Sequence, residues 1–148
     1  MTMELVIERR FSAPLDLVWD AWSSPDGKVG WWGPEGFTCD LNEMDFREGG
    51  RYRCEMRDPD GTRLVNIGAY TEIRPKTRIV MTYGWEDENG TAAMESIIEL
   101  EFEADGDGTK MRFKQSGFES EEDRDGHRDG WTEALDDLDR ALARVLVA

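Results

Sequence analysis

The residues best suited to chemistry in this chain gather at the start of its last segment. His127, the only histidine, lies four residues before Trp131. Apolar residues continue at steps of four and three through Leu135, Leu138, Leu142 and Val145. This spacing predicts a long C-terminal helix with one apolar stripe. His127 on that stripe could offer a hydrogen bond or a proton to a bound molecule. It could also bond a backbone carbonyl and hold the helix start, and we favour this structural role.

Two glycines interrupt the same predicted helix. Gly126 and Gly130 stand four residues apart beside the stripe, and each costs roughly 1 kcal/mol of helix stability relative to alanine. One explanation is close packing of a strand or of the Trp31–Trp32 segment against the helix. The other is that the glycines leave room for a ligand. Both explanations stay open at the level of sequence.

Aromatic and methionine side chains provide candidate walls for a ligand site. Aromatic rings with a polar edge suit the mouth of an apolar pocket, and methionine adapts to irregular space. The candidate cavity residues are Trp31, Trp32, Tyr52, Met56, Met81, Tyr83, Trp85, Phe113, His127, Trp131 and Leu135. For any single one of them, a place in the ordinary hydrophobic core is the plainer interpretation.

Catalytic motifs are missing from the sequence. It has no G-x-S-x-G elbow, phosphate-binding loop, dinucleotide fingerprint or H-E-x-x-H pair. Asp40, Glu43 and Asp45 bring carboxylates to one predicted strand, but solvation at the surface explains them. We therefore expect no catalytic residue, metal or cofactor. An enzyme that works by shape and a few hydrogen bonds remains a less favoured alternative.

Composition limits the class of protein and its partners. Hydrophobic residues make up 39% and charged residues 34% of 148 residues, which predicts a globular protein with one domain over residues 1–148. The formal net charge of −15 opposes binding to nucleic acid or to an anionic membrane surface. No apolar run approaches the roughly 20 residues that span a bilayer. We expect a cytoplasmic protein, as a monomer or a homodimer.

The two cysteines are predicted to be free thiols. Cys39 and Cys54 fall on neighbouring strands of one predicted hairpin, three positions out of register, which is poor geometry for a disulfide. A zinc site would also lack histidines and a C-x-x-C pair.

The remaining segments predict a sheet. A first strand over 4–11 is followed by two short helices, one over Leu15–Trp22 and one ending at Trp31–Pro34. Further strands are predicted over 37–46, 51–57, 62–73, 78–85, 93–104 and from 109 to 115. The last two form a hairpin whose pairs are Glu103–Lys110, Glu101–Arg112, Glu99–Lys114, Phe102–Met111, Leu100–Phe113 and Ile98–Gln115. One face of this hairpin is ionic and the other apolar, so the helix is expected to cover the apolar face in an α+β arrangement.

Several blocks of the sequence resemble a known family. They are Ala13–Pro14, Val18–Trp19, Ala21–Trp22, Trp31–Pro34, Arg47–Tyr52, Asp60–Gly61 and Gly126–Trp131. In this order they resemble the bacterial branch of the activator-of-heat-shock-protein-90-ATPase homologues, within the START-like (SRPBCC) superfamily. The resemblance implies a helix-grip fold, in which a curved antiparallel sheet of about six to seven strands wraps around a long C-terminal helix, with an internal cavity in many members.

The resemblance implies three kinds of function. The superfamily includes lipid and hormone binders, co-chaperone-like domains, and polyketide cyclases and aromatases. Our leading hypothesis is a binding protein for a small, largely apolar molecule held between sheet and helix. The alternative is a chaperone-interaction module of the stress response, as the family name suggests. The third is a cyclase- or hydrolase-like enzyme, and a fold alone does not choose among them.

Overall fold

Seven strands and two helices make up the described part of the chain, which comprises residues 3–24, 31–32 and 36–147 of a computed structural model. The strands are β1 Met3–Phe11, β2 Thr38–Met44, β3 Arg51–Arg57, β4 Arg63–Arg74, β5 Arg78–Glu86, β6 Ala92–Asp105 and β7 Gly108–Phe118. The helices are α1 Leu15–Ser23 and α3 Glu121–Val147. The second predicted short helix falls largely on residues 25–30 and 33–35, outside the described residues.

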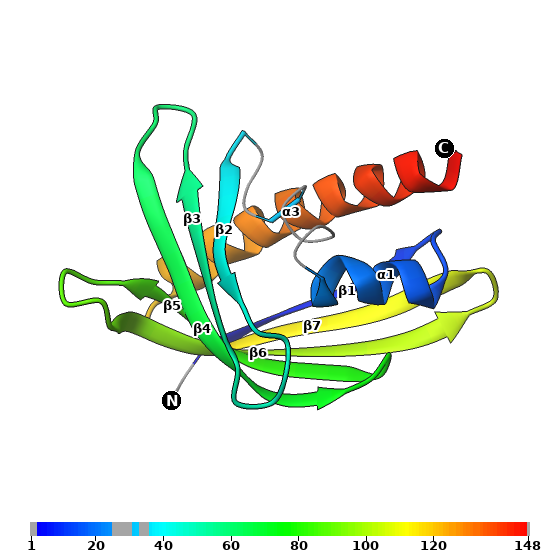
Figure 1. Cartoon of the computed structure of the whole chain (residues 1–148), viewed down its shortest axis with the longest axis horizontal. Helices are drawn as coiled ribbons and strands as arrows, with labels where there is room; N and C mark the ends of the chain where they lie inside the picture. The colour runs from blue at the N-terminus through cyan, green and yellow to red at the C-terminus, as the bar shows by residue number, and fades with distance from the viewer. Residues whose placement is uncertain (1–2, 25–30, 33–35, 148) are drawn as a thin grey trace.

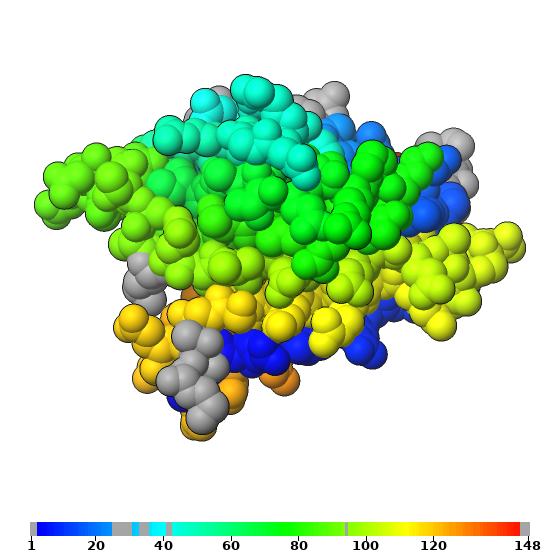
Figure 2. All heavy atoms as spheres, turned by 90° about the horizontal axis from the view of Figure 1, so that it is seen from below, coloured from blue at the N-terminus to red at the C-terminus, as the bar shows by residue number. Residues whose placement is uncertain are grey.

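All seven strands join one antiparallel sheet in the order β1-β7-β6-β5-β4-β3-β2. Figure 1 shows this sheet bending upward toward β2 and β3, with α3 running across its concave side. The outer face in Figure 2 carries the strands as neighbouring bands, from β1 in blue through yellow and green to the cyan segment around β2. The predicted α+β helix-grip architecture is therefore confirmed. No helix in the described ranges is long and apolar enough to cross a membrane.

The β6–β7 hairpin has the predicted register, pair for pair. Its outer face is ionic: the Arg78 guanidinium on neighbouring β5 lies 2.8 Å from a Glu99 carboxylate oxygen and 3.1 Å from one of Glu101. The hydrogen bond from Arg78 lowers the pKa of the Glu99 carboxyl below its ordinary value. The inner face is apolar, and Ile98, Leu100 and Phe113 on it are fully buried. Alternation along each strand thus separates a wet face from the core.

A serine side chain caps the start of helix α3. The Ser120 hydroxyl accepts a hydrogen bond from the Asp123 backbone N–H at 3.1 Å, which caps the helix. The stripe from Trp131 through Leu142 is buried against the sheet. Val145 is 55% exposed, so the predicted stripe ends one turn early and that part of the expectation is wrong. On the flank of the helix, the Arg9 guanidinium lies 2.7 Å from an Asp136 carboxylate oxygen and ties α3 to β1.

The prediction of free thiols is wrong, because a disulfide joins Cys39 to Cys54. In the β2–β3 pair, Cys39 faces Met56 and Leu41 faces Cys54, so the cysteines are two positions out of register and not three. Side chains alternate between the faces of a strand, so an even offset places both cysteines on the same face. Their Cα atoms are 6.3 Å apart, within the range that a disulfide spans. The irregular pairing after Leu41 has no signal in the sequence.

Candidate functional site

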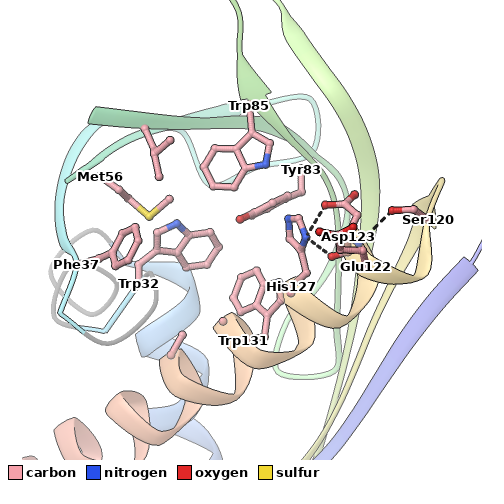
Figure 3. A pocket seen from close by; sticks show the side chains of 14 residues that line it. Trp32, Phe37, Met56, Tyr83, Trp85, Ser120, Glu122, Asp123, His127 and Trp131 are labelled. Atoms are coloured by element: carbon pink, nitrogen blue, oxygen red, sulfur yellow. Dashed lines mark hydrogen bonds and ion pairs between the residues drawn. The ribbon is translucent and has the colours of Figure 1, made fainter. Parts of the chain in front are cut away.

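A pocket of about 500 Å³ lies between the first turns of α3 and the inner face of β3, β4 and β5. Figure 3 shows it from close by. Its helix wall consists of Gly126, His127, Gly130, Trp131 and Ala134, and its sheet wall of Met56, Leu64, Tyr83 and Trp85. Trp32 and Phe37 close a third side, and Ser120, Glu122 and Asp123 line the end nearest the helix start. The volume lies within the range of about 300–1,000 Å³ found for small-molecule sites.

The two glycines that interrupt the predicted helix, Gly126 and Gly130, both line the pocket. A Cβ atom built on Gly126 would meet no atom outside its own helix within 4 Å, and Gly130 lines the same pocket. For Gly126, close packing is therefore not the reason for the glycine. The missing side chain widens the pocket at the start of α3.

The structure brings six of the eleven candidate cavity residues to the pocket wall. They are Trp32, Met56, Tyr83, Trp85, His127 and Trp131. The other five are almost fully buried and lie in the core, outside the pocket lining: Trp31, Tyr52, Met81, Phe113 and Leu135. Phe113 supports the wall directly, since its ring centroid lies 4.7 Å from that of Trp131. The Tyr52 hydroxyl is used within the sheet, where it donates to the Thr82 carbonyl at 2.7 Å.

Adjacent aromatic rings of the wall meet at steep angles. The centroids of Tyr83 and Trp85 are 5.7 Å apart with ring planes at 81°, and those of Trp32 and Trp131 are 5.2 Å apart at 83°. The ring centroids of Tyr83 and Trp131 are also 5.7 Å apart, so these two rings contact each other as well. Four rings from three segments of the chain therefore surround the space on different sides (Figure 3).

The Tyr83 hydroxyl is the polar group aimed into the pocket. Figure 3 shows its oxygen pointing toward the space between Trp32 and Trp85. Tyr83 is only 6% exposed, and among the described residues its hydroxyl has no hydrogen-bond partner. Burial, and secondarily the charge of Asp123, raise the pKa of this phenol well above its ordinary value of about 10. At neutral pH the group is a protonated hydroxyl, able to donate to or accept from a ligand.

His127 has the structural bond that the sequence favoured. Its Nδ1 lies 2.9 Å from the Asp123 carbonyl oxygen and 3.3 Å from the Asp123 Oδ1 atom. Because both neighbours are acceptors, we assign the Nδ1–H tautomer to the neutral ring, which leaves Nε2 as an acceptor. The ring packs beside Phe118, at 5.0 Å between centroids, and faces Tyr83 at 6.1 Å. It is held in place at the edge of the pocket.

A buried chain of hydrogen bonds fixes the orientation of Trp131. The Trp131 indole N–H donates to Gln115 Oε1 at 2.9 Å, and Gln115 Nε2 donates to the Ser96 hydroxyl at 2.8 Å. Ser96 in turn donates to the Tyr83 carbonyl at 3.1 Å. Sequence reasoning missed this chain, although one signal was present: Gln115 is a polar residue on the apolar face of the hairpin. It also missed the pocket residues Phe37, Leu64, Ser120, Glu122, Asp123 and Ala134.

The substitution Gly126→Ala is expected to stabilise the free protein by about 0.5–1 kcal/mol, because alanine has the higher helix propensity and the new methyl group meets open space. Gly106→Ala is the matched control. Its surroundings are equally open, but its φ of +60° disfavours any L side chain, so this change should destabilise by about 1 kcal/mol. Urea denaturation measures both. A loss of stability in Gly126→Ala would contradict an open pocket at this helix position.

Comparisons with known proteins agree with this fold. A family model described as activator of Hsp90 ATPase homolog 1-like protein matches residues 12–143. A crystal structure of a protein from Chromobacterium violaceum is 26% identical, with a TM-score of 0.85 over 94% of this chain and 96% of that chain. The AHSA1 protein from Silicibacter pomeroyi is 25% identical, with a TM-score of 0.84 over 95% and 98%. A protein from Rhizobium leguminosarum is 32% identical, with a TM-score of 0.79 over 97% and 96%. No curated protein matches the chain.

Proposed function

The chain belongs to the family of activator of Hsp90 ATPase homolog 1-like proteins, and from this premise we propose that it binds a small, largely apolar molecule between its sheet and its C-terminal helix. The family and fold are consistent with either a ligand-binding module or an activator of the Hsp90 ATPase. The observation that carries the proposal is the pocket of about 500 Å³ with aromatic walls.

Two features of the pocket support a ligand over an ordinary packing defect. The first is the Tyr83 hydroxyl, which opens onto the pocket and has no hydrogen-bond partner within the described residues. A ligand that displaces water from this hydroxyl can take up its free hydrogen-bonding capacity. The second is the rigid support of the wall by the Trp131–Gln115–Ser96 hydrogen bonds. Pockets that bind small molecules combine such preformed apolar walls with a few placed polar groups.

The test uses N-phenyl-1-naphthylamine, a neutral apolar probe whose fluorescence rises on leaving water. We expect one probe to bind per chain and to raise the melting temperature. A ligand at 100 times its Kd stabilises the folded state by about 2.7 kcal/mol if it does not bind the unfolded state. Absence of both effects would contradict the proposal.

A pair of variants at one position locates the binding site. Gly126→Phe places a ring in the open space beside the glycine and should weaken probe binding at least tenfold. Gly126→Ala adds a single methyl group at the same place and should leave most of the affinity. If the probe binds Gly126→Phe as tightly as the parent chain, it occupies another surface, and the proposed site is wrong.

The family name supports a second candidate, a chaperone-interaction module. This function needs an exposed contact surface and does not need the pocket. Pull-down from native cytosol distinguishes the two: specific recovery of the Hsp90 ATPase that persists with Gly126→Phe would favour the chaperone role. Probe binding without such recovery would favour the ligand role.

A further inference from the structure

Carboxylates are the acidic groups on the pocket lining, and one histidine is beside them. Its ionisable residues are the carboxylates Glu122 and Asp123 together with His127, and no lysine or arginine is among them. Arg124, which follows Asp123 on the helix, is directed to Asp125, with a nitrogen–oxygen distance of 3.0 Å. Within the described residues, the pocket lining therefore holds two carboxylates and no lysine or arginine to balance them.

The helix N-terminus does not reverse this sign. Unsatisfied N–H groups at a helix start are equivalent to about half a positive charge. The first turn of α3 carries three carboxylates, Glu121, Glu122 and Asp123, and the Ser120 hydroxyl already accepts one of its N–H bonds. The net charge of −15 on the chain reinforces the negative potential.

The walls suit a cation that has lost its water. Trp32, Tyr83, Trp85 and Trp131 surround the space, and aromatic faces attract cations, tryptophan most strongly. Two groups at the same place are able to accept a hydrogen bond: the Tyr83 hydroxyl oxygen, and Nε2 of His127 when its ring is neutral. Aromatic walls, acceptors and nearby carboxylates are the features that recognise quaternary and protonated amines.

Building on the proposed ligand site, we propose that the ligand is an apolar or aromatic molecule carrying a cationic amine. The amine lies among the rings of Trp32, Tyr83, Trp85 and Trp131, on the side of the pocket nearest Glu122 and Asp123. The apolar body extends toward Met56, Phe37 and Leu64.

Three probes with one benzyl group test the charge preference. Benzyltrimethylammonium carries the cation, neopentylbenzene is its uncharged carbon analogue, and benzylsulfonate carries a negative head. Each is measured by displacement of N-phenyl-1-naphthylamine and by calorimetry. We expect the cation to bind at least tenfold more tightly than neopentylbenzene, and benzylsulfonate to bind most weakly. Repeating the series in 1 M salt removes general attraction to the acidic surface, since the screening length is then about 3 Å.

Variants connect the preference to the pocket. Trp85→Leu keeps an apolar wall but loses the ring, so it should reduce the preference for the cation severalfold while neopentylbenzene still binds. Glu122→Gln should weaken only the cation. Glu121→Gln is the matched control, because it removes the same charge one residue away, outside the pocket lining.

The outcomes separate this inference from the function on which it rests. If the naphthylamine probe binds and neopentylbenzene displaces it as well as the cation does, the preference for a cation is wrong and the apolar site stands. A cation preference that Glu121→Gln lowers as much as Glu122→Gln would assign it to the surface and also overturn the inference. If none of these compounds binds, both proposals fall.

Discussion

Raising the pH above about 10 is expected to unfold this protein in one steep transition. All three of its tyrosines, Tyr52, Tyr70 and Tyr83, are buried on the inner face of the sheet. Burial is the main cause that raises the pKa of each phenol above its ordinary value of about 10. The folded state therefore keeps three protons that the unfolded chain releases in alkaline solution.

The direction of the effect follows from proton linkage. Below about pH 10 the phenols are protonated in both states and do not change the free energy of unfolding. Above it the unfolded state binds fewer protons, so stability falls by about 1.4 kcal/mol per pH unit for each tyrosine, or about 4 kcal/mol per unit for the three. A domain with about 5–8 kcal/mol of stability would be lost by about pH 12.

Phenolate absorbance at 295 nm and far-ultraviolet circular dichroism, followed on the same samples, measure the transition. The two signals should change together, because the tyrosines ionise only as the fold is lost. Tyr83→Phe removes one of the three groups and should reduce the pH dependence of stability by about a third. Tyrosines that titrate near pH 10 in a protein with native dichroism would contradict the burial of these phenols.

The strands and their register could be predicted because the information is local. The 105–108 turn and alternating side chains determine the β6–β7 pairing, and the spacing from Trp131 to Leu142 determines the buried stripe of α3. Periodicity does not indicate where an element stops being covered. Val145 continues the apolar spacing, but it lies on the last turn of α3, where its side chain is exposed.

Most of the pocket depends on contacts between distant segments. The Cys39–Cys54 disulfide depends on a one-residue shift in the β2–β3 pairing, and no residue of the turn between these strands predicts that shift. The glycines of α3 indicated that the helix face was special, but only the arrangement of β3, β4 and β5 around it shows open space. Leu64 and Phe37 are unremarkable in the sequence because their place on the wall depends on the curvature of the sheet.

The substitution Gln115→Met is expected to lower the free energy of unfolding by about 2–4 kcal/mol. The sequence gives little sign that Gln115 holds Trp131 in place. Methionine fills a similar volume but cannot accept from the Trp131 indole N–H or donate to Ser96. Gln115 is fully buried, so water cannot replace either bond. Leaving a buried polar group unpaired costs about 1–3 kcal/mol. The midpoint of urea denaturation should fall with little change in its slope.

A double-mutant cycle separates the hydrogen bond from the loss of packing. Trp131→Phe removes the donor and leaves Gln115 Oε1 unpaired, while the double variant removes both partners. The double variant should therefore cost about 1 kcal/mol or more less than the sum of the single changes. Lys114→Met, on the outer face of the same strand, is the matched control. Its ion pairs with Glu4 and Glu99, at 3.4 and 3.7 Å, lie near the surface, so this change should cost under about 1 kcal/mol. Strict additivity in the cycle would show that Gln115 does not hold Trp131, and the pocket wall would then have to be positioned by packing alone.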